Sequence, residues 1–392
     1  MSLTNKKIGI ITLPTLTNYG GILQAYALHT VLSRLGYESE VIEKYLYPRQ
    51  LSAIQKAYLY PFRFIKKYVF NKQCGIRTER NLKETAKDRF EIAKFTKTFI
   101  NEYIPHRYVY DFHEINRNDY SAFIVGSDQI WRPKYVRGYR MTLDDAFLGF
   151  AHNWETTKIS YSASFGSNGW EYTPEETTYC KKLLQSFSAV SCREESGVRF
   201  CQSILGYQKA TMAIDPTLLL SAEDYNAIID KIKNNDDTRM DDGGIMSYIL
   251  DKSEEKDLII SYAQKHTGYN LCEIGANTNS REGTLEGRYL PLVESWLEGF
   301  KKAKLIITDS YHACVFSIIY RKSFIAIANL ERGNARFDSL LKMFDLENRL
   351  LHSYSEKQIQ AIIDVPLSIN EGLLKAEQQR SFDYLKANLL AV

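Results

Sequence analysis

The residues best suited to chemistry are Ser310 and His312, which stand between the apolar run 305–308 and the helix-like run 313–320. This order predicts a strand, a tight turn and a helix, with a hydroxyl and an imidazole at the start of the helix. The free backbone N–H groups there favour an anion, and a histidine can hold a phosphate or move a proton near neutral pH. The alternative is that Ser310 only caps the helix and His312 is a partly buried surface residue.

Three arginines could share an anionic ligand with that histidine. Arg193 stands at the end of a strand-like run, and Arg332 and Arg336 follow the apolar run 324–327. In an open α/β sheet the carboxyl ends of the strands form the edge where ligands bind. Guanidinium groups bind phosphate and carboxylate in a bidentate manner, although a salt bridge to a nearby acid is the commoner role of an arginine. Together these residues predict a cleft for a small, doubly anionic ligand.

Two further loops could hold a sugar, and their candidate residues are Asn18, Tyr19, Gly20, Asp128, Gln129 and Trp131. In the first loop a glycine lets the backbone approach a ligand, and an asparagine offers both a donor and an acceptor. In the second loop a carboxylate could bind hydroxyls while the aromatic ring covers the apolar face of a sugar. The other interpretations are an ordinary strand-to-helix turn and a helix N-cap.

Strands and helices alternate along the chain. A strand at 8–13, a helix at 22–35 and a strand at 40–43 predict a βαβ opening. We expect further strands at 123–125, 159–163, 189–192, 248–250, 270–273, 305–307 and 324–327, and a final helix at 370–390. Residues 50–118 are rich in Lys, Arg, Tyr and Phe at helical spacing and predict a helical insertion, and the polar stretch 231–244 is the best linker candidate.

The expected fold class is α/β, with two Rossmann-like domains that face a central cleft. A chain of 392 residues is too long for one ordinary core. We expect an N-terminal domain at 1–235 that carries the helical insertion at about 50–118. The C-terminal domain at 236–392 ends in a helix that packs back toward the N-terminal domain.

Composition excludes several classes of protein. The net charge of +3 gives no reason to expect a nucleic acid partner, and 44% hydrophobic with 25% charged residues fits a globular protein. No apolar run is long enough to span a membrane, and the N-terminal residues do not resemble a signal peptide. The six cysteines have no CxxC spacing, so we expect no metal site. A reduced, cytoplasmic enzyme is the simplest expectation, and peripheral membrane association stays open.

Six motifs occur in an order that resembles the polysaccharide pyruvyl transferase family. They are NYGGILQAYAL (18–28), FIVGSDQIW (123–131), SCREES (191–196), AIDPTLL (213–219), TDSYHACVFSIIYRKSFIAI (308–327) and NARFDSLL (334–341). The resemblance runs from about Lys7 to Leu350, and the order of the motifs is more specific than any one of them.

The resemblance implies a fold similar to the GT-B glycosyltransferases. It also implies transfer of pyruvate from phosphoenolpyruvate to two hydroxyls of a sugar, which makes a cyclic ketal without a cofactor. It matches Arg193 and His312 to the family's arginine and histidine, and Arg332 or Arg336 to its downstream basic residue. We therefore expect catalysis by His312 and Arg193, and donor binding by these two with Ser310 and either Arg332 or Arg336. The acceptor would be a sugar or a glycan-lipid in exopolysaccharide or cell-wall biosynthesis. Many members have a glycine after the histidine, where this chain has Ala313.

Two other functions fit the same elements. One is a GT-B-type glycosyltransferase that uses a nucleotide sugar, since fold alone does not fix function. The other is a non-catalytic sugar-binding protein. The sequence does not specify the acceptor sugar or its linkage.

Overall fold

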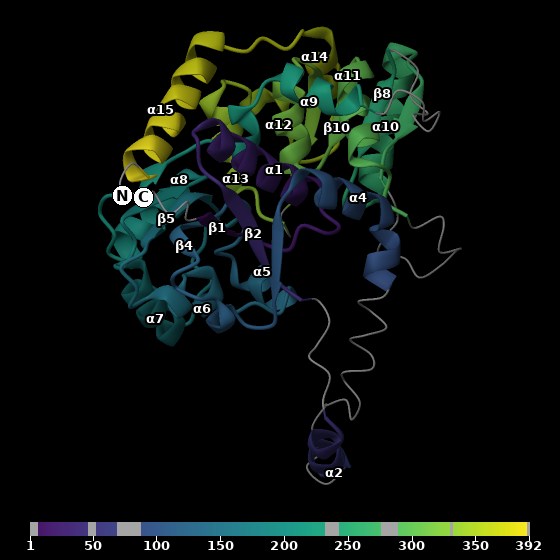
Figure 1. Cartoon of the computed structure of the whole chain (residues 1–392). Helices are drawn as coiled ribbons and strands as arrows, with labels where there is room; N and C mark the ends of the chain where they lie inside the picture. The colour runs from purple at the N-terminus through teal and green to yellow at the C-terminus, as the bar shows by residue number, and fades with distance from the viewer. Residues whose placement is uncertain are drawn as a thin grey trace.

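The computed structural model describes residues 7–45, 52–68, 88–231, 243–275, 289–329 and 332–389. Its framework is two parallel β-sheets with helices packed around them (Figure 1). The first sheet uses strands from the N-terminal half of the chain and the second uses strands from the C-terminal half. The protein is therefore of the α/β class with two Rossmann-like units, as predicted.

The first sheet has seven strands in the order β3-β2-β1-β4-β5-β6-β7, and all neighbours that pair are parallel. The strands are β1 (Lys7–Ile11), β2 (Ser39–Lys44), β3 (His106–Val109), β4 (Tyr120–Val125), β5 (Thr157–Ala163), β6 (Ala189–Cys192) and β7 (Thr211–Met212). The central strands are almost wholly buried, because helices cover both faces of a parallel sheet. Continuous apolar runs such as 122–125 follow from this burial.

The second sheet has five parallel strands in the order β12-β11-β10-β8-β9. They are β8 (Ile245–Tyr248), β9 (Leu271–Glu273), β10 (Leu305–Thr308), β11 (Ser323–Ile327) and β12 (Leu350–Leu351). The strand order reverses between β10 and β8, and such a switch point leaves a crevice at the carboxyl ends of the strands.

Helices connect most of these strands. They are α1 (Tyr19–Arg34), α2 (Ala53–Tyr68), α4 (Lys94–Tyr103), α5 (Pro133–Gly138), α6 (Leu143–Ala146), α7 (Pro174–Leu184), α8 (Glu195–Arg199), α9 (Ala222–Ile229), α10 (Glu254–Thr267), α11 (Val293–Lys302), α12 (Tyr311–Ile319), α13 (Ala335–Met343), α14 (Glu356–Asp364) and α15 (Glu371–Leu389). Among the described residues, no helix has the length and apolar character that crossing a bilayer requires.

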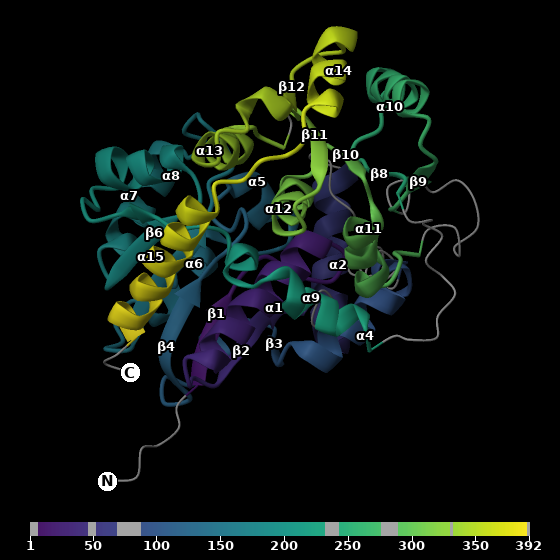
Figure 2. The same ribbon diagram turned by 90° about the horizontal axis from the view of Figure 1, so that it is seen from above.

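The last helix, α15, packs against elements of the N-terminal half (Figure 2). The hydroxyl of Tyr384 donates to the backbone oxygen of Ser160 in β5 at 2.8 Å. The hydroxyl of Ser381 accepts from the backbone N–H of Ile214 at 3.3 Å. The chain thus returns to the first sheet after completing the second.

The structure differs from the helical insertion expected at 50–118. Residues 50–118 are not one helical insertion, because β3 lies within that range and pairs with β2. The sequence of β3, HRYV, is short and partly polar, so it lacks the apolar pattern from which a strand is predicted. Within the same range, residues 69–87 lie outside the described residues, as do residues 232–242 of the linker candidate.

The two halves of the chain share an aromatic contact. The ring of Tyr19 in α1 stacks on Trp296 in α11, with ring centroids 5.3 Å apart and an interplanar angle of 13°. The hydroxyl of Tyr19 donates to the backbone oxygen of Pro291 at 2.7 Å. Both rings are buried, so this stack fastens the first helix of one half to the other half.

We therefore expect Trp296→Ala to lower the free energy of unfolding by about 3–5 kcal/mol, since it removes a fully buried ring and leaves a cavity. Urea unfolding monitored by circular dichroism would measure the loss. Leu258→Ala is the control, because Leu258 is 55% exposed and its truncation should change stability by less than about 0.5 kcal/mol. Similar losses in both variants would contradict a special role for the stack.

Candidate active site

A cavity of about 250 Å³ lies where loops from both sheets meet. The loops that follow β1, β4, β8 and β10 contribute to its wall, together with the first turns of α12 and α13. The lining residues used below are Asn18, Asp128, Gln129, Asp309, Ser310, His312, Arg332 and Arg336. The carboxyl ends of the strands thus form this site, as they do in other open α/β folds.

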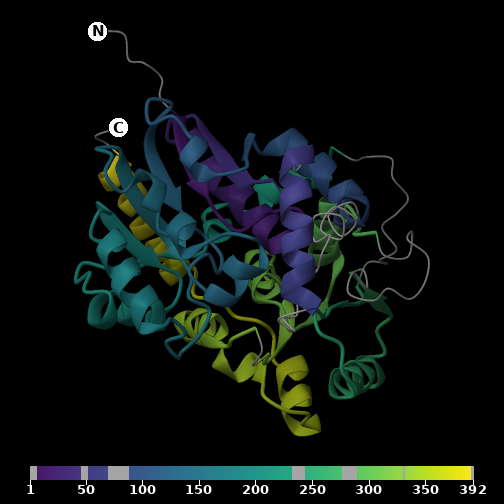
Figure 3. The ribbon, with the colours of Figure 1, turned by 90° about the horizontal axis from the view of Figure 1, so that it is seen from below.

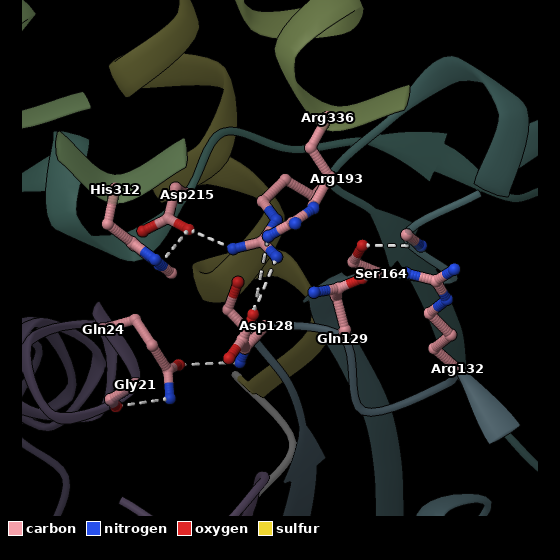
Figure 4. Close-up of polar contacts among 12 residues, drawn as sticks. Gly21, Gln24, Asp128, Gln129, Arg132, Ser164, Arg193, Asp215, His312 and Arg336 are labelled. Atoms are coloured by element: carbon pink, nitrogen blue, oxygen red, sulfur yellow. Dashed lines mark hydrogen bonds and ion pairs between the residues drawn. The ribbon is translucent and has the colours of Figure 1, made fainter. Parts of the chain in front are cut away.

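His312 lies in the first turn of α12 and lines the cavity. Its Nε2 is 3.5 Å from a carboxylate oxygen of Asp215 (Figure 4). Its Nδ1 faces Gly20 of α1, where an added Cβ would lie 1.9 Å from that nitrogen. Glycine is required at position 20 because the imidazole occupies the space of a side chain. Gly20 therefore serves to seat the histidine, and it does not line the cavity as an acceptor contact.

Arg193 is buried between two carboxylates (Figure 4). Its Nη1 donates to Oδ2 of Asp215 at 2.6 Å, and its Nη2 donates to Oδ1 of Asp128 at 3.1 Å. The side chain is 1% exposed and the guanidinium lies 4.5 Å from the ring centre of Tyr311. This geometry does not favour direct binding of a donor by Arg193. Both terminal nitrogens of its guanidinium already bind carboxylates, and Arg193 does not line the cavity.

Arg193 and the basic groups near it keep the carboxylates of Asp128 and Asp215 ionised. Burial by itself raises the pKa of Asp128, but the positive charges of Arg193, His312 and Arg336 outweigh burial and lower it. Burial likewise opposes ionisation of Asp215, yet the contact with His312 and the charge of Arg193 bring its pKa well below the usual value. The site therefore holds two buried anions that orient two cations and an imidazole.

Arg336 and Arg332 differ in how their guanidinium groups are engaged. Arg332 makes two short hydrogen bonds to Asp251, at 2.6 and 2.9 Å, so its fork is occupied. Arg336 donates one hydrogen bond, from Nη2 to the backbone oxygen of Arg332, and its Nη1 is 4.0 Å from Asp128. Its Nε has no hydrogen-bond partner among the described residues. Burial and the charge of Arg193 lower the pKa of Arg336, so this cation would gain most from an incoming anion.

Asp309 fixes the turn that carries Ser310. Its carboxylate accepts from the backbone N–H groups of Leu250 and Asp251, at 2.6 and 3.1 Å, and from Nζ of Lys256 at 2.7 Å. Ser310 occupies the N-cap position of α12, but its hydroxyl makes no capping hydrogen bond. The capping alternative for Ser310 is therefore not seen, and Ser310 lines the cavity.

The acceptor candidates divide into two groups. Asn18, Asp128 and Gln129 line the cavity, and Nδ2 of Asn18 lies 3.4 Å from Oδ2 of Asp128. Tyr19 and Trp131 do not line it. Trp131 is fully buried, stacks on Phe147 at 4.9 Å and donates from Nε1 to a backbone oxygen. The expected sugar platform at Trp131 is therefore wrong, because a ring enclosed in the core offers no face to a ligand, and the same holds for Tyr19.

Gln24 is a supporting residue that the sequence did not reveal. Its Oε1 accepts from the backbone N–H of Ser127 at 2.9 Å, and its Nε2 donates to the backbone oxygen of Gly21 and to Thr12. These bonds hold the turn before Asp128, which has a left-handed backbone with φ of 59°. A buried glutamine in α1 gives no signal in sequence, because its partners are distant along the chain.

A second cavity of about 360 Å³ adjoins the first. It is lined by Thr17, Arg89, Ile92, Lys134, Tyr135, Gly138 and Tyr139. Thr17, Tyr135 and Tyr139 also line the first cavity, so the two spaces share a wall. Within the described ranges no cluster of three or more His, Cys, Asp or Glu side chains could hold a metal ion.

We expect Asp215→Asn to destabilise the protein by about 3–5 kcal/mol at neutral pH, because it leaves the buried Arg193 short of a counter-charge. The pKa of Asp215 is lower in the folded chain than the unfolded value of about 3.9. The ionised carboxylate of Asp215 therefore contributes fully to the free energy of unfolding above about pH 4. This contribution is lost as the pH falls through the pKa of Asp215 in the folded chain. The difference in unfolding free energy between wild type and Asp215→Asn should thus shrink in acid.

Urea unfolding at a series of pH values would measure this difference. Glu155→Gln, at an exposed position, is the control and should show no such pH-dependent difference. A difference for Asp215→Asn that stays constant down to strongly acid pH would refute the assignment of an ionised, paired carboxylate.

Comparison with family models gives a match that spans most of the chain. A family model described as polysaccharide pyruvyl transferase matches residues 18–331. A sequence search of curated proteins gives no significant match. Among solved structures, the chain is similar to UDP-GlcNAc 2-epimerase from Neisseria meningitidis bound to UDP-GlcNAc, with 11% identity, 98% of this chain and 100% of the other covered, and a TM-score of 0.48.

Two other solved structures show a similar degree of likeness. The UDP-GlcNAc 2-epimerase from Methanocaldococcus jannaschii has 11% identity, covers 97% of this chain and 99% of its own, and gives a TM-score of 0.49. A UDP-glucosyltransferase from Polygonum tinctorium has 10% identity, 99% coverage of both chains and a TM-score of 0.42. These likenesses are distant, whereas the family match spans most of the sequence. The chain belongs to the polysaccharide pyruvyl transferase family.

Proposed function

We propose that this transferase moves pyruvate from phosphoenolpyruvate to two hydroxyls of a sugar in a polysaccharide or glycan precursor and forms a cyclic ketal. The observation that carries the proposal is the small cavity in which His312, Ser310 and Arg336 meet at the start of α12. The family match supports the same reaction class. The product would serve exopolysaccharide or cell-wall assembly, and a donor drawn from metabolism supports a cytoplasmic location.

The donor carries a carboxylate and a phosphate on three carbons, and the cavity offers complementary groups. Arg336 has donor capacity that the protein leaves unused, and a charge-assisted hydrogen bond to an anion would use it. The first turn of α12 adds backbone N–H groups and the positive end of a helix dipole. Arg193 would act indirectly, because its hydrogen bonds hold Asp128 and Asp215 in place.

The reaction balances without an oxidant or a reductant. A proton adds to C3 of the enol, and a sugar hydroxyl attacks C2, which has oxocarbenium character. The second hydroxyl then closes the ring while phosphate leaves. Of the two hydroxyl protons, one replaces the proton given to C3 and the other leaves with phosphate. The products are a ketal and inorganic phosphate.

His312 is the group we assign to protonation of C3. Asp215 would stabilise the charged imidazole, since its carboxylate lies 3.5 Å from Nε2. A general acid of this kind contributes roughly 10²–10⁴-fold to the rate. Asn18, Asp128 and Gln129, which line the same cavity, would contact the acceptor hydroxyls. Thermal-shift assays with phosphoenolpyruvate against UDP- and GDP-sugars would separate this function from nucleotide-sugar transfer, which predicts stabilisation by the nucleotide sugars alone.

We expect Arg336→Ala to weaken phosphoenolpyruvate binding by about 2–5 kcal/mol, because a buried anion loses its charged partner. Arg332→Ala is the matched control, and its affinity should stay within a few-fold of wild type because Asp251 already occupies that guanidinium. Calorimetry without added metal would measure both. Equal losses in the two variants, or binding only with a divalent ion, would count against this donor site.

His312→Gln should keep much of the donor affinity through its side-chain amide but lose most of the turnover, if the imidazole protonates the enol. A purely phosphate-binding role would instead lower affinity and leave the saturated rate intact. A structural role would lower the melting temperature and leave activity intact in the cold. Affinity, saturated rate and melting temperature of this one variant distinguish the three roles, and unchanged turnover would remove His312 from catalysis.

A further inference from the structure

Helix α2 exposes large apolar side chains. Ile54, Tyr58, Phe62 and Ile65 are 83%, 74%, 56% and 47% exposed. Their spacing of four, four and three residues places them on one face of the helix. Figure 1 draws α2 apart from the two sheets, and Figure 3 views the molecule from the side on which it lies. Large apolar side chains that gather on one exposed face mark an interaction surface.

The side of α2 opposite Ile54 carries basic residues. Lys56 and Arg63 lie seven residues apart, and therefore on nearly the same side of the helix, away from Ile54. The sequence of the helix also includes Lys66 and Lys67 and contains no Asp or Glu. The 16 residues of α2 thus carry four basic residues and a formal charge of +4.

From these two faces we propose that α2 is an interfacial helix that docks the protein on an anionic lipid bilayer. A helix with aromatic and aliphatic residues on one face and Lys or Arg on the other lies in the plane of the headgroups, with its apolar face at the acyl boundary. The basic residues meet the negative surface of the leaflet at the same time. The bilayer therefore satisfies both faces of α2.

Other partners satisfy only part of this pattern. A second copy of the chain would cover the apolar face, but its own α2 contains no Asp or Glu to meet the basic residues of the first. A nucleic acid would bind the basic face but leave Tyr58 and Phe62 in water. Charge complementarity together with apolar burial therefore favours the bilayer.

The position of α2 in the chain links it to the cavities. It follows β2, whose carboxyl end lies on the same sheet edge as the loop with Thr17 and Asn18. Arg89 and Ile92, which come next in the described chain, line the second cavity. Docking by α2 would hold this edge near the lipid surface, where a glycan attached to a lipid is found. Membrane docking does not depend on the proposed reaction, because neither face of α2 lines the first cavity.

Vesicle sedimentation of the full chain tests the proposal. Wild type should bind vesicles of equal parts phosphatidylglycerol and phosphatidylcholine at least about tenfold more tightly than phosphatidylcholine alone, and salt should weaken the binding. The double variant Ile54→Asp and Phe62→Asp should lose at least about tenfold of this affinity. Lys56→Glu with Arg63→Glu should lose affinity only for the anionic vesicles.

Leu258→Asp with Val365→Asp is the matched control, since both positions are exposed and apolar but lie outside α2. This variant should bind vesicles as wild type does. Phosphoenolpyruvate calorimetry on every variant separates a failed donor site from failed docking. Binding that does not depend on the lipid charge or on α2 would overturn the proposal. So would a dimer that only the Ile54→Asp and Phe62→Asp variant dissociates, without vesicle binding.

Discussion

The buried guanidinium of Arg193 is the interaction on which the rest of the site depends. A charge removed from water is stable only when counter-charges accompany it, and here Asp128 and Asp215 supply them. The three residues follow three different strands of the first sheet, so their ion pairs fix three loops at one edge. Asp215 also faces His312 of the second sheet's helix. One buried cation therefore sets the distance between the two sheets' contributions to the cavity.

A second buried ion pair plays a similar part on the other wall. Lys256 and Asp309 meet at 2.7 Å, and Asp309 also binds the backbone after β8 and the side chain of Asn329. These bonds hold the turn before α12 and do not involve Ser310 or Arg336. Arg336 thus keeps an Nε that has no hydrogen-bond partner among the described residues, beside Ser310, whose hydroxyl makes no capping hydrogen bond. Such preorganisation is what lets fixed dipoles and charges stabilise a transition state.

Much of this frame could be predicted from sequence, because buried parallel strands require continuous apolar runs and ligand loops follow them. The strand–turn–helix around His312 is the clearest case. Edge strands such as β3 and the two-residue β12 were not predicted because they are short, and β3 is also partly polar. Trp131 was predicted to contact a sugar but lies in the core. The sequence does not separate these two roles, because an aromatic residue next to polar residues is compatible with both. Supporting residues such as Gln24 and Lys256 are found only in three dimensions.

The contact between Gly20 and His312 has a consequence for how the enzyme handles its donor. The imidazole comes from one half of the chain, while the glycine seat and the carboxylate of Asp215 come from the other. If the two halves moved apart, the proton donor would lose both at once. The imidazole would then lie away from Asp215 and from the glycine that makes room for it. Under the proposed reaction, the imidazole would therefore be positioned to protonate the donor only while the two halves are in contact.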